Sequence, residues 1–158
     1  MKIPIRTLRD QRGFNLIELM IVIAIIGLLI GVGAYGWQSM MRAGNETTAA
    51  QSLDKIRTFQ AQYAAKTKNF GTFDDLIRTV GLDDRFAGER PVVNGYVFTM
   101  EVDEKSDSAP AFYSIRADPQ VSDGVSATGS IHYYTDSNLS TIRNTTESRP
   151  ATPEDPSL

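Results

Sequence analysis

The sequence predicts an α+β protein in which one long N-terminal helix packs on a small antiparallel sheet of three or four strands. Two observations support this fold class. An uncharged, mostly apolar run from Leu19 to Met41 continues into a segment with helical periodicity, and strand-like segments separated by turn residues follow residue 90. An amphipathic helix and a sheet would bury their apolar faces against each other.

The apolar run is long enough to cross a membrane. As a helix rising ~1.5 Å per residue, its 23 residues reach about 35 Å, which exceeds a hydrocarbon core of roughly 30 Å. The basic residues that precede it would keep the N-terminus in the cytoplasm: Lys2, Arg6, Arg9 and Arg12. We therefore predict a membrane-spanning helix over residues 14–41.

Glu18 is an acidic residue at the start of this apolar segment, and no Lys or Arg follows it until Arg42. A carboxylate within a bilayer costs about 2–3 kcal/mol, so Glu18 is expected to have a partner. Cleavage between Gly13 and Phe14 would supply one, because the new α-amino group would lie about one helical turn from Glu18. A conventional signal peptide is cut after its apolar core, whereas this cut would remove residues 1–13 as a leader and leave the anchor on the mature chain.

The segment from Gly13 to Gly27, GFNLIELMIVIAIIG, resembles the leader junction of type IV prepilins and of the related pseudopilins of type II secretion. The resemblance extends to about Trp37. It implies that a prepilin peptidase cuts after Gly13, that the Phe14 amine is methylated, and that Glu18 pairs with the N-terminal amine of a subunit during filament assembly. Asn15 stands where the family usually has Ser or Thr, and we expect little effect from this difference.

Composition excludes several other functions. The chain has no cysteine, which excludes a disulfide, a thiolate nucleophile and a cysteine metal site. Many major pilins close their C-terminal region with a disulfide, so this absence slightly favours a pseudopilin. Removal of residues 1–13 takes Lys plus Arg from 16 to 12 and Asp plus Glu from 19 to 18, so the formal charge changes from −3 to −6. Such an acidic chain gives no indication of nucleic-acid binding.

Four glycines lie in a ten-residue stretch inside the anchor: Gly27, Gly31, Gly33 and Gly36. Interior glycines lower helix propensity by ~1 kcal/mol each, but membrane helices use them for close packing. We expect a continuous helix in the monomer, in which residues 27–36 are the part most able to lose helical pairing in a filament.

Helical periodicity continues beyond Arg42, and it predicts one helix from about Asn15 to Lys66. The apolar stripe facing the head consists of residues three or four positions apart: Ala49, Leu53, Ile56, Phe59 or Gln60, and Tyr63. Residues 67–71 are expected to form a turn in which Asn69 and Gly71 accept positive φ.

A short second helix is predicted after this turn. Thr72 is its expected N-cap, with Asp75 at the third helical position, and Gly81 is its expected stop. The predicted buried side consists of Phe73, Leu76, Ile77 and Val80.

The remaining segments predict strands over Val92–Val102 (interrupted near its start at Asn94-Gly95), Ala111–Ala117, Ser130–Thr135 and Leu139–Arg143. Residues 42–143 would then form the globular head. Residues 144–158 contain three prolines and few apolar residues, so we expect a flexible C-terminal tail.

The head offers little that indicates chemistry. Asp118, Asp123 and Asp136 lie in or beside predicted loops and are weak candidates for calcium ligands, because their spacing matches no dedicated motif. His132 is the single histidine and is expected to be structural. No nucleophile elbow, P-loop or dinucleotide fingerprint is present, so we expect neither a cofactor nor enzymatic activity.

These features favour a structural subunit of a type IV pilus, assembled by burying residues 14–41 in a filament core. Its implied partners are copies of itself, the prepilin peptidase, the membrane and the inner-membrane pilus or secretion assembly machinery. The subunit would lie in the inner membrane and then in an extracellular pilus. The alternatives are a pseudopilin in a periplasmic pseudopilus and a membrane-anchored binding module with a prepilin-like leader. Adhesion, motility and DNA uptake remain open as roles, as does major or minor subunit status.

Overall fold

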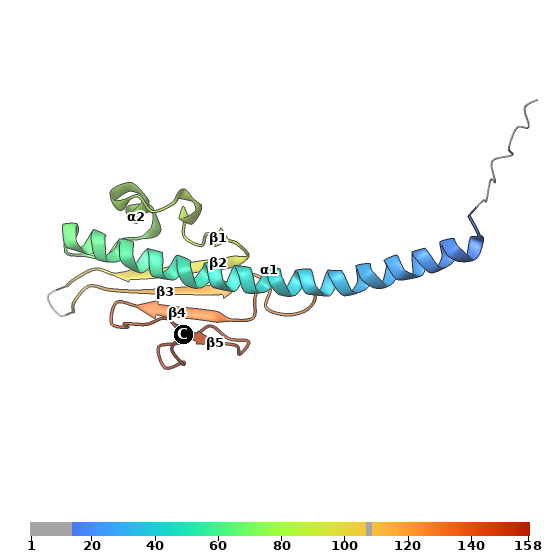
Figure 1. The fold of residues 1–158 in the computed structure, drawn as a ribbon. Helices are drawn as coiled ribbons and strands as arrows, with labels where there is room; N and C mark the ends of the chain where they lie inside the picture. The colour runs from blue at the N-terminus through green and yellow to red at the C-terminus, as the bar shows by residue number, and fades with distance from the viewer. Residues whose placement is uncertain (1–13, 107–108) are drawn as a thin grey trace, which may run out of the picture. The chain divides into compact units, whose positions relative to one another are not determined.

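The computed structural model describes residues 14–106 and 109–158. The predicted leader, residues 1–13 with Gly13, lies outside these residues. The chain divides into two compact units, whose described parts are residues 14–37 and 38–158. The elements follow in the order α1 (Leu16–Thr67), α2 (Phe73–Val80), a 3₁₀ helix η1 (Asp84–Phe86), β1 (Val92–Val93), β2 (Tyr96–Asp103), β3 (Phe112–Pro119), β4 (His132–Asp136) and β5 (Arg143–Thr145), as Figure 1 shows.

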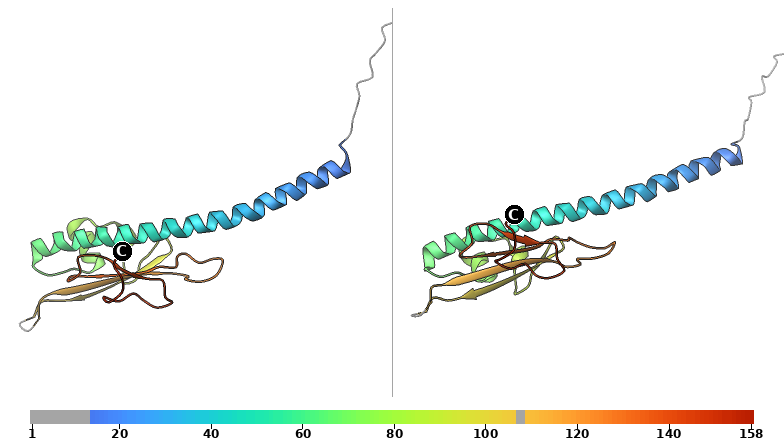
Figure 2. Two further views of the ribbon diagram at one scale, coloured as in Figure 1. Left: turned by 60° about the horizontal axis from the view of Figure 1, so that its bottom comes forward. Right: turned by 90° about the horizontal axis from the view of Figure 1, so that it is seen from below.

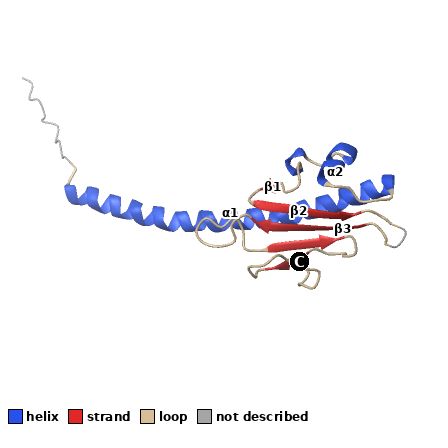
Figure 3. Cartoon of the chain, turned by 180° about the vertical axis from the view of Figure 1, so that it is seen from behind, coloured by secondary structure: helices blue, strands red, loops and turns tan. Residues whose placement is uncertain are grey.

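The second unit contains a five-stranded sheet in the order β1-β2-β3-β4-β5, with every neighbouring pair antiparallel. The second half of α1 runs along one face of this sheet (Figures 2 and 3). The core lies between them and includes residues from both layers: Ala49, Leu53, Ile56, Tyr96, Phe98 and Ile115. The predicted fold class is therefore confirmed, with one strand more than expected.

The additional strand arises at Asn94-Gly95. Both residues have positive φ, 48° and 73°, which is typical of the two-residue turn that closes a tight hairpin. Val93 consequently pairs with Tyr96, and the segment predicted as one interrupted strand is two antiparallel strands. Gly95 is required here, since a Cβ would lie 2.7 Å from Thr128.

The buried stripe of α1 includes Gln60 rather than Phe59, which is half-buried. Gln60 is fully buried, and its amide is satisfied by the backbone of Gly71. Nε2 donates to the Gly71 carbonyl at 2.6 Å, and Oε1 accepts from the Gly71 N–H at 3.1 Å. A buried polar side chain is tolerated when it is hydrogen-bonded in this way.

The turn after α1 forms as predicted, but its left-handed residue is Lys68, with φ 66°, rather than Asn69 or Gly71. Gly71 is needed for a different reason. A Cβ there would lie 3.0 Å from the Tyr63 ring, because the chain passes directly over α1.

The predicted ends of α2 are confirmed. The Thr72 hydroxyl oxygen accepts from the Asp75 N–H, and the Asp75 carboxylate accepts from the Thr72 N–H, which is a capping box. The hydrogen bond from the Thr72 hydroxyl also lowers the pKa of Asp75. Gly81 ends the helix in the left-handed conformation, with φ 78°.

The last strand begins later than predicted, at Arg143 instead of Leu139. The Asp136 carboxylate accepts the N–H groups of Asn138 and Leu139 at 2.7 and 2.9 Å, which keeps this segment in a turn. The Arg57 guanidinium binds the carbonyl of Leu139 at 3.2 Å. Backbone groups of Asn138 and Leu139 that could pair with a neighbouring strand are thus hydrogen-bonded to side chains.

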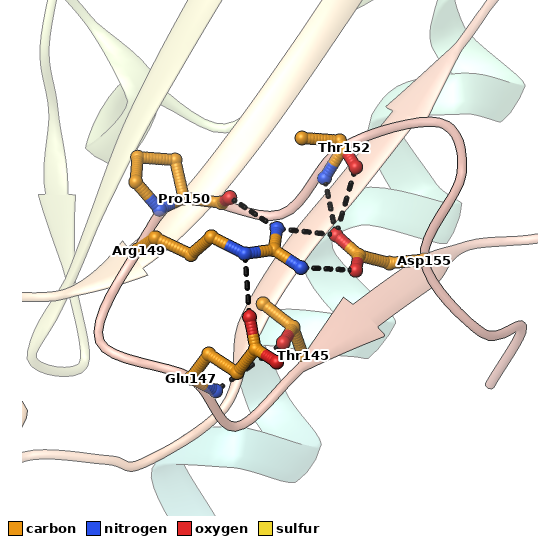
Figure 4. A network of polar contacts seen from close by, with 6 residues as sticks. All are labelled: Thr145, Glu147, Arg149, Pro150, Thr152 and Asp155. Carbon is orange, nitrogen blue, oxygen red and sulfur yellow. Dashed lines mark hydrogen bonds and ion pairs between the residues drawn. The ribbon is translucent and has the colours of Figure 1, made fainter.

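The prediction of a flexible tail over residues 144–158 is wrong. Arg149 forms two hydrogen bonds with the Asp155 carboxylate, at 2.6 and 2.8 Å, and a third with Glu147 at 2.6 Å (Figure 4). The Arg149 guanidinium holds the pKa of Asp155 well below its usual range. Thr152 donates its N–H to the same carboxylate at 2.7 Å, so polar side chains order a segment that has few apolar ones.

The C-terminus also covers the outer edge of the sheet. Ser157 forms a bridge with Arg143 of β5, and the Leu158 N–H donates to the Ile142 carbonyl at 2.9 Å. Ala151, within the same segment, is only 2% exposed. Residues 144–158 therefore belong to the second unit.

Candidate assembly interface

The first turn of α1 is closed by Asn15 and Glu18. Asn15 precedes the helix, and its Oδ1 accepts the Ile17 N–H at 3.3 Å. Glu18 Oε2 in turn accepts the Asn15 N–H at 3.2 Å. These bonds make Asn15 the N-cap of α1, a position for which Asn is well suited, and Glu18 at the third helical position accepts the Asn15 N–H in return.

The sequence analysis missed this role of Asn15, although the signal was present. An Asn followed three residues later by Glu, directly before an apolar run, is a helix-start signature. A carboxylate in the first turn also interacts favourably with the positive end of the helix dipole. Glu18 thus has a structural partner in its own chain before any assembly.

The Glu18 carboxylate can accept more than the one hydrogen bond from Asn15. Its two oxygens offer about four acceptor positions, and an N-methylated ammonium group supplies two donors. Phe14, which would carry the new amine, is 92% exposed. The first turn can therefore keep its cap and still bind a positively charged amine.

The surface of α1 that follows is apolar on all sides. An 18-residue window of this helix has a mean hydropathy of 2.8, and none of the window is buried within the chain. By length and composition this is a helix that can cross a membrane. Its large apolar side chains are about half exposed or more, including Leu16, Met20, Ile23, Leu28, Leu29, Ile30 and Val32.

Residues 8–34 match the family described as "Prokaryotic N-terminal methylation motif". A stretch of 75 residues is 31% identical to part of the "Type IV wide pilus major component PilA4" of Thermus thermophilus. The aligned stretch covers 48% of this chain and 57% of that protein. The chain thus spans little more than half the length of this relative. The motif, the relative and the fold agree with one another. The chain thus resembles type IV pilins in its N-terminal segment and in its pilin-like α+β fold.

The glycines of the apolar helix have no packing role within the monomer. α1 is continuous through Gly27, Gly31, Gly33 and Gly36, as expected for the monomer. A Cβ built on any of them would meet no atom within 4 Å. Small residues leave shallow depressions in which the backbone of a neighbouring helix can approach closely, so these positions are open to contacts with another helix.

The three candidate calcium ligands of the head are not brought together. The Asp118 carboxylate accepts from His132 Nδ1 at 2.6 Å across β3 and β4, whereas Asp136 accepts from backbone N–H groups at the far end of β4. The strand register places these two carboxylates about four residues apart, or ~13 Å. Asp123 contacts Ser122 in the β3–β4 connection. Among the residues that the structure describes, no three His, Cys, Asp or Glu side chains form a metal-binding group.

His132 is 8% exposed and is held by Asp118. Its contact with Asp118 connects β3 and β4 of the sheet. The anchor segment, rather than the head, therefore carries the features that indicate function.

Proposed function

We propose that this chain is a structural subunit of a type IV pilus. It is cut after Gly13 by a prepilin peptidase, N-methylated at Phe14, held in the inner membrane by residues 14–41, and then incorporated into an extracellular filament. Residues 42–158 form the head on the outer surface of that filament.

The observation that carries this proposal is the exposed apolar surface of α1, together with the Glu18 carboxylate that is held in its first turn. Fully burying a Leu or Ile side chain contributes roughly 1.5–3 kcal/mol, so a helix with many such side chains at about half exposure needs an apolar environment. Lipid supplies it before assembly, and the helices of other subunits supply it afterwards.

Pairing between Glu18 and a neighbouring Phe14 amine would set the register of successive subunits. In a filament core of low polarity, an unpaired carboxylate or ammonium group is costly, and the pair removes both costs. The hydrogen bond that Glu18 accepts from the Asn15 N–H supports this role, because it fixes the position of the carboxylate at the start of the helix. The Gly27–Gly36 section would then adjust, by local loss of helical pairing, to the spacing that this register requires.

The proposal is tested by expressing the full chain in a host that has a pilus assembly machinery but no major pilin of its own. Sheared surface filaments are expected to contain, as their main component, a species with the mass of residues 14–158 plus one methyl group. A Gly13→Leu variant keeps the apolar helix and the basic leader, and it should retain the mass of residues 1–158 in the membrane. Filaments that contain the uncut chain, or an absence of filaments, would contradict the proposal.

A pseudopilin of type II secretion is a second candidate, and the cysteine-free sequence favours it slightly. The polar C-terminal segment is folded against β5 and does not distinguish the two candidates. Filaments confined to the periplasm, and restored export in a host that lacks its own major pseudopilin, would support this alternative.

A further inference from the structure

Three asparagines of the head stand in the triplet Asn-x-Ser/Thr, which is the acceptor sequence for N-linked sugars: Asn45, Asn138 and Asn144. Such triplets are common by chance, so the sequence alone assigns a sugar to none of them. A bulky, hydrophilic sugar requires an acceptor at the surface, in a segment that is neither helix nor strand. The structure places only one of the three in such a segment.

Asn45 and Asn144 are part of regular structure and are half-buried. Asn45 lies within α1, and its Nδ2, the atom that would carry the sugar, donates to the Thr128 carbonyl at 2.9 Å. Asn144 lies within β5 and pairs with Tyr133, a core residue that is 2% exposed. Because directly paired residues lie on the same face of a sheet, the Asn144 side chain faces the core. A sugar at either position would displace contacts of the head.

Asn138 is exposed, in the turn that follows β4. Its backbone N–H is bound by the Asp136 carboxylate at 2.7 Å, whereas its side-chain amide has no hydrogen bond to any residue that the structure describes. The Arg57 guanidinium holds the turn by donating to the carbonyls of Leu139 and Ser140, at 3.2 and 2.8 Å. Ser140, whose hydroxyl completes the triplet, is exposed as well. The backbone of the turn is thus fixed, and the acceptor amide is open to solvent.

The residues that precede the three asparagines separate them further. Bacterial oligosaccharyltransferases generally require an acidic residue two positions before the acceptor Asn, in addition to the triplet. Asp136 stands at that position for Asn138, whereas Ala43 and Ile142 stand there for the other two. Residues 136–140, DSNLS, therefore carry a complete bacterial acceptor sequence. This sequence criterion is independent of the exposure of the turn, and both select the same asparagine.

Asp136 also determines when a sugar can be transferred. In the folded head it is 5% exposed. Its carboxylate accepts the N–H groups of Asn138 and Leu139 and the hydroxyl of Tyr134, at 2.7, 2.9 and 3.0 Å. A transferase that binds this carboxylate must therefore act before β4 and the turn have folded. The fold accommodates the sugar afterwards, because the Asn138 side chain is exposed.

We propose that Asn138 is an acceptor for an N-linked oligosaccharide, transferred while the head emerges on the side of the membrane opposite the cytoplasm. The Asn138 amide nitrogen forms a bond with C1 of the first sugar of a lipid-linked oligosaccharide. The bond between C1 and the lipid pyrophosphate breaks, the pyrophosphate leaves with the bonding electrons, and the transferase takes the proton that the amide releases. The inference rests on the proposed function only in requiring an exported head, which a pilus subunit and a pseudopilin share.

The test expresses the full chain in a bacterial host that carries such a transferase and its lipid-linked oligosaccharide. The intact mass of the membrane-bound chain is expected to increase by one oligosaccharide, and to stay unshifted in the same host without the transferase. Asn138→Gln and Ser140→Ala should remove the increase, whereas Ser140→Thr should retain it. The matched controls are Thr47→Ala and Thr146→Ala, at exposed positions. They destroy the other two triplets, keep their asparagines, and should leave the increase unchanged.

An increase that persists in Asn138→Gln, or that is lost in either control, would overturn the inference and leave the proposed function intact. An exported wild-type chain of unshifted mass, in cells that modify a separate reporter acceptor, would have the same meaning. Export is measured separately, by digestion of the head with protease added to spheroplasts. A head that is digested only after the inner membrane is permeabilised is cytoplasmic, and that result would contradict the proposed function and the inference together.

Discussion

The two halves of α1 have the same backbone geometry but opposite surroundings. In the first half, the large apolar side chains from Leu16 to Trp37 that are exposed have between 48% and 74% of their surface accessible. In the second half, Ala49, Leu53 and Ile56 are at most 2% exposed. A helix segment that is apolar on one face can bury that face against its own head. A segment that is apolar all round requires an apolar environment outside the chain. One continuous helix therefore serves folding and, in the proposed filament, assembly.

The comparison predicts that substitutions in the first half affect assembly and those in the second half affect folding. The largest effect is expected for Glu18→Gln. Gln keeps an acceptor for the Asn15 N–H but removes the charge, so the proposed partner amine is left unpaired. Since an unpaired buried charge costs about 3–5 kcal/mol, the yield of sheared filaments should fall on the order of a hundredfold or more, with the membrane level unchanged.

The matched control for this experiment is Asn15→Ala, which removes the cap and keeps the charge. Loss of an N-cap costs about 1 kcal/mol, so the filament yield should fall by less than about tenfold. If Asn15→Ala abolished filaments while Glu18→Gln assembled normally, capping rather than pairing would be the function of this turn.

Two leucines of the same helix provide the next test. Leu53→Ala removes a fully buried side chain, and the free energy of unfolding of the head should fall by about 2–5 kcal/mol. Leu29→Ala removes a side chain that is 65% exposed, so the free energy of unfolding should stay unchanged. Denaturant unfolding of the full chain in detergent micelles, followed by tyrosine fluorescence, measures both. Equal destabilisation would show that the two halves of α1 fold as one cooperative unit.

A smaller effect is expected for Gln60→Leu. This change leaves the N–H and carbonyl of Gly71 without their partner, at a cost of about 1–3 kcal/mol. Gln51→Leu, at an exposed position of the same half of α1, is the control and should be nearly neutral. A neutral Gln60→Leu would indicate that water replaces the side chain at Gly71.

The smallest effect concerns the C-terminal segment, which the second unit orders by polar contacts. Because Arg149 lowers the pKa of Asp155 in the folded state, the contact stabilises the segment fully above the unfolded pKa of about 3.9. This stabilisation is lost as the pH falls through the lower, folded pKa. Hydrogen exchange at the Leu158 amide, corrected for its intrinsic pH dependence, should therefore accelerate below about pH 4 in the wild type.

In an Arg149→Met variant the same amide should already exchange faster at pH 6 and respond less to acid. The unfolding midpoint of the head should change little, because the segment lies at the edge of the sheet. Identical pH profiles in both proteins would show that the ion pair does not order the C-terminus.

Features set by local sequence were largely predictable. The extent of α1, the capping box of α2 and its stop at Gly81 each depend on residues within a few positions of one another. The resemblance of the anchor to prepilins was confirmed by the family match over residues 8–34. The same local reasoning would have identified Asn15 as an N-cap, had its spacing to Glu18 been considered.

Features set by contacts distant in sequence were not predictable. The choice of Gln60 over Phe59 for the core depended on the Gly71 backbone, which lies opposite Gln60 only in the folded head. Arg57 binds carbonyls in the turn after β4 and so contributes to the late start of β5.

By itself, the sequence determined that this chain has a basic N-terminal segment, an apolar helix with one carboxylate in its first turn, and an amphipathic continuation, because composition and spacing suffice for these. Only the tertiary structure decided that residues 144–158 are ordered and that the connection between β3 and β4 is bound to Arg42. Both features depend on hydrogen bonds between polar groups, and the spacing of apolar residues in the sequence does not indicate such bonds. Their partners become neighbours only after the sheet and α1 have packed together.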